Sequence, residues 1–136
     1  MRNSTQLIFC NKDVNPNDVT RLLGLTPSES VSVGDTAVRD NGHQYISHLG
    51  IWKHHLINAD FTHTVEEQIA QWLKLLEPKS AALSQLKALG YRPYLDCKAD
   101  QGSLSLCVEP DLLVQLGKLN IALSVWLYEQ SPTVEA

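Results

Sequence analysis

One strand-helix pattern occurs twice in this sequence of 136 residues and constrains the fold more than any other feature. Near the start, the apolar residues 7–10 are followed by Pro16 and by a short amphipathic segment that ends at Gly24. Residues 104–117 repeat the pattern, with a largely apolar run, a proline and a glycine in the corresponding places. Proline favours the first turn of a helix and glycine its end, so each copy predicts a strand followed by a helix. Two such units in a short chain predict a sheet packed on helices.

Local signals predict the other elements. Asn41-Gly42 predicts a hairpin turn, because both residues tolerate the positive φ of a tight turn. A long strand is expected over 44–57, but neither of its faces is cleanly apolar. Thr64 and Glu67 form a capping box that begins a strongly amphipathic helix, and Pro78 is expected to end it. The remaining expected elements are a helix over 80–89 and strands over 91–98, 103–108 and 121–128, with a hairpin around 100–102.

The resulting order of elements, β-α-β-β-α-α-β-β-α-β, predicts one α+β domain over residues 1–136, with a C-terminal tail at 131–136. We expect a two-layer sandwich, ferredoxin-like or a decorated variant, with a mostly antiparallel sheet and the helices on one face. A pseudo-twofold axis is expected to relate the two strand-helix units. The residues expected to be buried together are Leu7, Phe9, Leu22, Leu23, Ile69, Trp72, Leu73, Leu106, Leu116, Leu123 and Val125.

Composition and charge exclude several classes of protein. Hydrophobic residues make up 43% of the chain and charged residues 19%, as in ordinary globular proteins. A formal net charge of -4 argues against a general nucleic-acid binder. The apolar runs are too short for a membrane span or a secretory leader, so we expect a cytoplasmic protein. The three cysteines, Cys10, Cys97 and Cys107, are odd in number and do not suggest a disulfide scaffold.

The order and spacing of several short motifs resemble a known family. Residues 19–27, the pair Gly34-Asp35, the isolated Trp52 and the helix end over 75–78 resemble a bacterial family described as domain of unknown function 4279. The resemblance covers roughly residues 5–129 and implies a small α+β domain. It implies no established activity, and no catalytic residue carries over to a position of this chain. By analogy with other small bacterial families, it suggests an immunity protein that neutralises a toxin.

The five histidines do not predict a metal site. His48 and His54 share one face of the expected long strand, but six residues of strand separate them by about 20 Å. His54 and His55 are adjacent and would point to opposite faces. The sequence has no His-x3-His and no Cys-x2-Cys motif, so we expect no metal and no cofactor.

No motif for nucleophilic catalysis or phosphate binding is present, so we expect a protein that is not an enzyme. Cys10 and Cys107 occupy matching places in the two strand-helix units, which indicates packing rather than reactivity. The alternative is a small hydrolase with an unrecognised site in which His48 or His54 pairs with Asp35.

Aromatic residues form one candidate binding surface. Trp52 with His54, and Trp126 with Tyr128, are candidates to line a sheet face free of helices. Basic residues are sparse in those strands, so the competing interpretation is a core or dimer role for these rings. Trp72 lies on the apolar stripe of its helix and is expected in the core.

The helix surface at Glu66 and Glu67 is a second candidate, either a solvated face or a docking surface for a basic toxin domain. We therefore expect a non-catalytic cytosolic binding protein, most concretely a toxin-neutralising immunity protein. A homodimeric structural or regulatory domain, formed through a free strand edge or an aromatic sheet face, is a further alternative. We expect no nucleic acid and no membrane among its partners.

Overall fold

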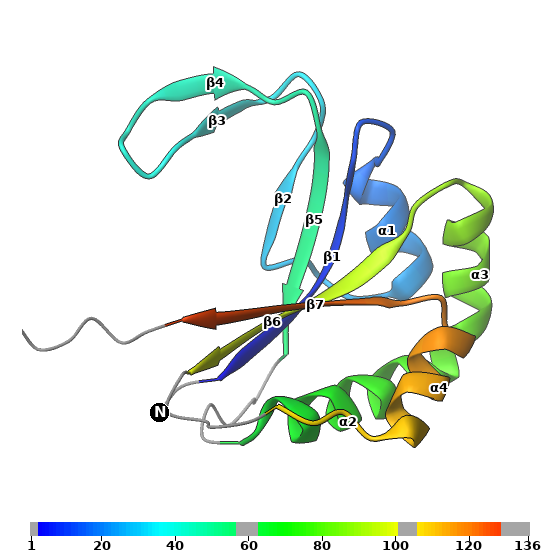
Figure 1. The fold of residues 1–136 in the computed structure, drawn as a ribbon. Helices are drawn as coiled ribbons and strands as arrows, with labels where there is room; N and C mark the ends of the chain where they lie inside the picture. Colours follow the sequence, from blue (N-terminus) through cyan, green and yellow to red (C-terminus); the bar gives the residue numbers. More distant parts are fainter. Residues whose placement is uncertain (1–2, 57–62, 101–105, 129–136) are drawn as a thin grey trace, which may run out of the picture.

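A computed structural model describes residues 3–56, 63–100 and 106–128 of the chain. Its main sheet has five strands in the order β2-β5-β1-β6-β7, and a separate two-stranded sheet pairs β3 with β4 (Figure 1). The strands are β1 (Ser4–Asn11), β2 (Glu29–Val31), β3 (Thr36–Val38), β4 (Gln44–Ile46), β5 (Gly50–His55), β6 (Pro93–Asp100) and β7 (Ala122–Tyr128). The helices are α1 (Pro16–Leu23), α2 (Val65–Leu76), the 3-10 turn η1 (Glu77–Lys79), α3 (Ser80–Ala88) and α4 (Pro110–Lys118).

The strand directions confirm an α+β fold with a mostly antiparallel sheet. The central strand β1 is antiparallel to both neighbours, β5 and β6, and β2 is antiparallel to β5. Only β6 and β7, at one end of the main sheet, are parallel. The finer prediction of ferredoxin-like layering with all helices on one face is not confirmed.

The first strand-helix unit forms as its sequence predicts. The side chain of Asn15 accepts a hydrogen bond from the Asn17 backbone N–H at 3.0 Å and so caps α1, and Pro16 occupies its first turn. Gly24 ends the helix in the left-handed region, at φ 69°. Each of these contacts is local in sequence, which is why the pattern could be recognised without the fold.

The second unit is different. Residues 106–109 are not in a strand, and residues 103–105, where the rest of the predicted strand falls, lie outside the described residues. The hairpin expected around residues 100–102 is likewise largely outside them. The helix α4 instead precedes β7, which lies parallel to β6. The predicted correspondence between Cys10 and Cys107 was therefore wrong, because Cys107 lies outside any strand.

The long strand predicted over 44–57 is two strands that belong to different sheets. The hairpin at Asn41-Gly42 forms as expected, with Gly42 at φ 85°, and pairs β3 with β4 away from the main sheet (Figure 1). At Ser47 the side-chain hydroxyl donates to the carbonyl oxygen of Leu49 at 2.7 Å, and the chain bends before β5 begins. A bend closed by a serine hydroxyl leaves no gap in the apolar pattern, so the sequence showed one strand.

The capping box at Thr64 and Glu67 is present, and α2 begins there as predicted. The predicted end of this helix is confirmed, because α2 ends at Leu76 and a separate helix, α3, covers Ser80–Ala88. Pro78 lies between them in the first turn of η1, where its missing N–H has no partner to lose.

The core lies between the main sheet and the helices (Figure 1), where α1 packs on β5 and α2 packs on β1 and β6. Seven of the eleven residues predicted to be buried together are in one buried cluster, and three more pack against it partly buried. Val125 is the exception, with 37% of its surface exposed. It lies in β7, whose position at the end of the sheet leaves it neighbours on one side only.

Among the described residues, no helix combines the length and apolar character that crossing a lipid bilayer requires.

Candidate binding surface

The side of the main sheet opposite the core carries a broad, shallow hollow of about 760 Å³. Every residue that lines it belongs to a strand. Successive strand residues point to opposite faces, and the even-numbered residues of β1, β6 and β7 point away from the helices. We call this surface the open face. Its central members are Ile8, Cys10, Ile51, Lys53, Tyr94, Asp96, Lys98, Ser124 and Trp126.

An apolar floor lies at the middle of the open face. Ile8, on the central strand, is paired in register with Lys53 on one side and Tyr94 on the other. It is only 3% exposed although it points away from the core, because these longer neighbours cover it. Trp126 forms one border of the hollow and is 61% exposed. A covered apolar floor beside an exposed indole is more typical of a contact surface than of solvated sheet.

Charged groups surround this floor. The Lys53 ammonium lies 3.8 Å from the carboxylate of Glu29 on β2, and Lys98 is exposed beside Trp126 in the register of β6 and β7. Asp96 accepts a 3.4 Å hydrogen bond from the side-chain N–H of Gln6. The other side-chain atom of Gln6, Oε1, is buried and has no hydrogen-bond partner among the described residues.

Two titratable groups of the open face are held in their neutral forms. Burial raises the pKa of the Cys10 thiol, and the positive charge of Lys53 only partly opposes this. Burial also raises the pKa of the Tyr94 phenol, and the Cys10 thiolate that forms at high pH and the Asp96 carboxylate raise it further. A thiol with a raised pKa is a poorer nucleophile at neutral pH. The arrangement therefore suits hydrogen bonding and packing better than covalent chemistry.

Two of the predicted surface residues are in the core, so that part of the prediction is corrected. Trp52 is fully buried and donates its indole N–H to the hydroxyl of Thr20 at 3.0 Å. His54 is 3% exposed, and its ring stacks on Trp52 at 5.9 Å and contacts Trp72 edge-on. The even-numbered residues of β5 face the helices, which explains both positions. The alternative that gave these rings a core role was right.

Of the other predicted aromatic pair, Trp126 and Tyr128, the structure describes only the side chain of Trp126. Trp126 is on the exposed surface, as predicted. Tyr128 is the last residue of β7, and its side chain lies outside what the structure describes.

The two acidic residues of α2 that were predicted as a docking surface are hydrogen-bonded within the chain. The Glu67 carboxylate accepts a hydrogen bond from the Thr64 backbone N–H in the capping box. Glu66 accepts one from the backbone N–H of Cys107 at 2.8 Å. Both carboxylates are hydrogen-bonded to backbone groups of the chain, so they are poorly placed to serve as free charges on a docking surface.

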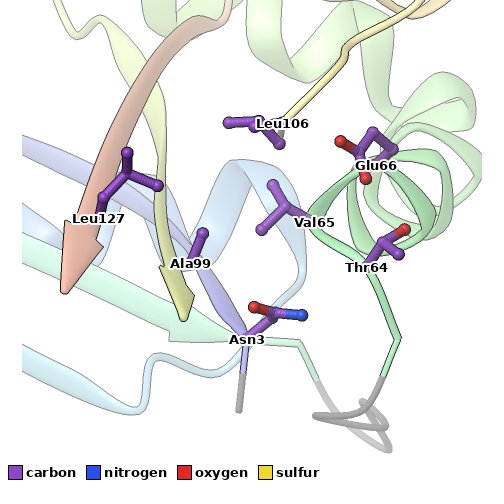
Figure 2. Close-up of a pocket in the computed structure, with 7 residues that line it drawn as sticks. All are labelled: Asn3, Thr64, Val65, Glu66, Ala99, Leu106 and Leu127. Carbon is purple, nitrogen blue, oxygen red and sulfur yellow. The ribbon is translucent and has the colours of Figure 1, made fainter. Parts of the chain in front are cut away.

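Glu66 also borders a second, much smaller hollow between α2 and the ends of β6 and β7 (Figure 2). The side chains of Val65 and Leu106 point into it from one side, and those of Ala99 and Leu127 border it from the other. Its volume, about 40 Å³, is close to that of one water molecule, so it is too small for a ligand.

For the hydrolase alternative, no side-chain hydrogen bond or ion pair in the described part of the chain joins Asp35 to His48 or His54, although the backbone N–H of Ser47 donates to the Asp35 carbonyl at 2.8 Å and so brings His48 near. The ring Nδ1 of His54 lies 2.6 Å from the carbonyl oxygen of Thr26, and the Asp35 carboxylate accepts from the Ser32 backbone N–H at 2.9 Å. His48 is exposed. Within the described part of the chain, no three His, Cys, Asp or Glu side chains are close enough to hold a metal ion.

The sequence predicted a helix-free sheet face with Trp126 on it, but it did not indicate the other residues of the open face. Ile8, Tyr94, Asp96 and Lys98 were available as alternating positions of β1 and β6. The signal that could have found this face is the mixture of apolar and charged residues on one side of β6.

Fold and surface together define a small α+β domain with a mostly antiparallel sheet. The chain belongs to the family described as Domain of unknown function (DUF4279), whose model matches residues 2–130. The resemblance found in the sequence is thereby confirmed. Searches among curated proteins and among solved structures gave no match.

Proposed function

We propose that this protein is a non-catalytic binding protein and that it holds a protein partner on the open face. The observation that carries the proposal is the hollow itself, with an apolar floor at Ile8 and charged groups around it. Interfaces commonly combine a desolvated apolar centre with a polar rim.

A macromolecular partner suits this surface better than a small molecule. Pockets for small molecules bury most of the ligand surface, whereas this hollow is shallow and Trp126 on its border is 61% exposed. The hollow extends over four neighbouring strands, which is the scale of a protein contact. Lys98 is exposed on its border, so we expect the partner to place a carboxylate there and an apolar side chain over Ile8 and Tyr94.

The neutral Cys10 thiol supports binding over covalent catalysis. Its pKa is raised by burial, which reduces the thiolate fraction on which nucleophilic attack depends. The specific version, a toxin-neutralising protein, derives from family analogy and from the acidic surface of α2. Because Glu66 and Glu67 are hydrogen-bonded within the chain, we centre the proposal on the open face instead. A toxin gene next to this one would support the specific version.

The test has two stages. A photo-cross-linking amino acid at position 98 on the open face is compared in cells with the same group at position 38, an exposed residue of β3. A protein cross-linked from position 98 alone is then purified and titrated against the chain. We expect Lys98→Glu to weaken binding at least about tenfold, which is about 1.4 kcal/mol.

Lys87→Glu is the matched control, because it makes the same charge change at an exposed position of α3. It should leave the affinity unchanged. Equal affinity for wild type and Lys98→Glu, together with equal affinity for Tyr94→Ala, would place the partner elsewhere and refute the proposal.

A further inference from the structure

The two edges of the main sheet differ in how they are protected. The edge strand β2 is three residues long and carries Glu29, which lies 3.8 Å from Lys53. The opposite edge strand, β7, is seven residues long, and its sequence ALSVWLY contains neither a charged residue nor a proline. Short edges, charges and prolines are the devices by which proteins prevent strands from pairing between molecules. The β2 edge is protected by its short length and by a charged residue, whereas the β7 edge has no such protection.

The exposure of β7 indicates how a partner would approach it. Trp126 and Leu127 are adjacent in sequence and each is 61% exposed. Adjacent strand residues point to opposite faces, and these two border different hollows, Trp126 on the open face and Leu127 beside α2 (Figure 2). A partner resting on one face would cover only one of them. A strand added along the edge, in the plane of the sheet, covers both.

We propose that β7 pairs with β7 of a second copy of the chain, antiparallel and across a twofold axis perpendicular to the sheet. The five strands of one copy would then continue into the five of the other. This dimer goes beyond the proposed function and does not depend on it. Both can hold together, because the centre of the open face stays free in each copy.

The chemistry of the strand favours a second copy over a foreign peptide. In an isologous contact the residue at the axis meets its own copy and every other contact occurs twice, so a charge near the axis would lie close to a like charge. The chain carries a net charge of -4, yet β7 carries none, and self-pairing therefore costs no like-charge repulsion inside the contact. Seven residues provide about 23 Å of edge, long enough for several backbone hydrogen bonds, and Val125, Trp126 and Leu127 add apolar cross-strand contacts.

The symmetry also limits the register. Residues directly opposite in an antiparallel pair lie on the same face, and β7 alternates, so the numbers of opposed residues differ by an even number. The axis then passes between the two copies of one residue. In the registers that pair at least five of the seven residues of β7, that residue is Ser124, Val125 or Trp126. That residue is the place where a cysteine can bridge the two chains.

Sedimentation of the full chain over a range of concentrations tests the pairing. We expect a reversible dimer at high micromolar concentration. Leu127→Lys should raise its dissociation constant at least about tenfold, because it replaces an apolar residue of the paired edge in each copy with a charge that pairing would desolvate. Ile46→Lys is the matched control, since Ile46 is 62% exposed and lies on β4 of the other sheet. It should dimerise like the wild type.

Cysteine cross-linking keeps the proposal testable if Leu127→Lys fails to fold. Ser124→Cys, Val125→Cys and Trp126→Cys are oxidised separately, beside the wild type and Ile46→Cys. We expect one of the three to form a disulfide-linked dimer well above both controls. A wild type that stays monomeric at high micromolar concentration would overturn the proposal. A dimer that tolerates Leu127→Lys but is lost on Lys53→Glu would also overturn it, because its interface is then the open face.

Discussion

The indole N–H of Trp72 donates a hydrogen bond to the hydroxyl of Thr5 at 2.9 Å and so joins α2 to the central strand β1. The same hydroxyl donates to Oε1 of Gln68 at 3.0 Å, and the Gln68 amide in turn donates to the backbone carbonyl of Asn3 at 2.9 Å. Thr5, Gln68 and Trp72 are all buried. A buried polar chain of this kind stabilises the fold only while each of its members keeps a partner.

We expect Thr5→Val to lower the free energy of unfolding by about 1–3 kcal/mol, because it leaves the Trp72 N–H and the Gln68 Oε1 without their shared partner. Urea unfolding monitored by tryptophan fluorescence measures the change. Thr5→Ser keeps the hydroxyl and should cost less. Thr36→Val, at an exposed position of β3, is the matched control and should stay within about 0.5 kcal/mol of the wild type. Equal effects at positions 5 and 36 would show that the network contributes nothing.

Two glycines are predicted to respond oppositely to the same substitution. A Cβ at Gly50, where β5 begins, would overlap the backbone carbonyl group of Val14. Backbone cannot move aside as a flexible side chain can, so Gly50→Ala should destabilise the protein by at least about 2 kcal/mol. Gly117, in α4, has open space around the same position. There alanine should stabilise by about 0.5–1 kcal/mol through its higher helix propensity. Thermal unfolding of the two variants gives the sign directly, and a stable Gly50→Ala protein would contradict the close approach.

Features set by neighbouring residues could be predicted from the sequence. The cap of α1 at Asn15, the capping box of α2 and the Asn41-Gly42 hairpin each depend on contacts within a few residues, and each is present. The end of β4 could not be predicted in this way. It depends on β4 pairing with β3 rather than with the main sheet, which the apolar pattern of residues 44–57 does not encode.

The candidate site was harder to predict, because a strand pattern does not say which face is covered. His54 looked like a surface residue, since a histidine is polar, but the Thr26 carbonyl satisfies its ring from 28 residues away. β7 presented the opposite difficulty. Its apolar residues alternate as they would in a central strand, and only its place at the end of the sheet order leaves Trp126 and Leu127 exposed. Both the partner of His54 and the edge position of β7 depend on contacts between distant parts of the chain, which the sequence pattern alone does not give.

The buried thiol of Cys97 predicts a loss of stability in alkaline solution. Burial, with the negative charge of Asp96 adding to it, raises the pKa of Cys97 from 9.0 to about 12. The folded protein therefore favours the neutral thiol. The resulting contribution to the free energy of unfolding is fully present below about pH 9 and is lost as the pH rises from there toward 12. The wild type should lose more unfolding free energy than Cys97→Ala between neutral pH and about pH 11. Urea midpoints over that range measure the difference, and parallel curves for the two proteins would refute it.

The last prediction concerns nucleic acids, because the open face resembles a base-stacking platform more than the sequence suggested. Lys98 pairs in register with Trp126, and Lys53 lies on the same face, so basic groups are present beside an exposed indole. Asp96 lies between them on β6, however, Lys53 is close to Glu29, and the chain carries a net charge of -4.

Phosphate contacts need several free cations, and their affinity falls steeply with salt. We therefore expect weak binding to single-stranded RNA or DNA at low salt and none at physiological salt. Fluorescence anisotropy with labelled oligonucleotides at both salt concentrations measures this. Micromolar affinity that persists at physiological salt and disappears in Trp126→Ala and Lys98→Glu, but not in Lys87→Glu, would make the open face a nucleic-acid surface and replace the protein partner proposed for it.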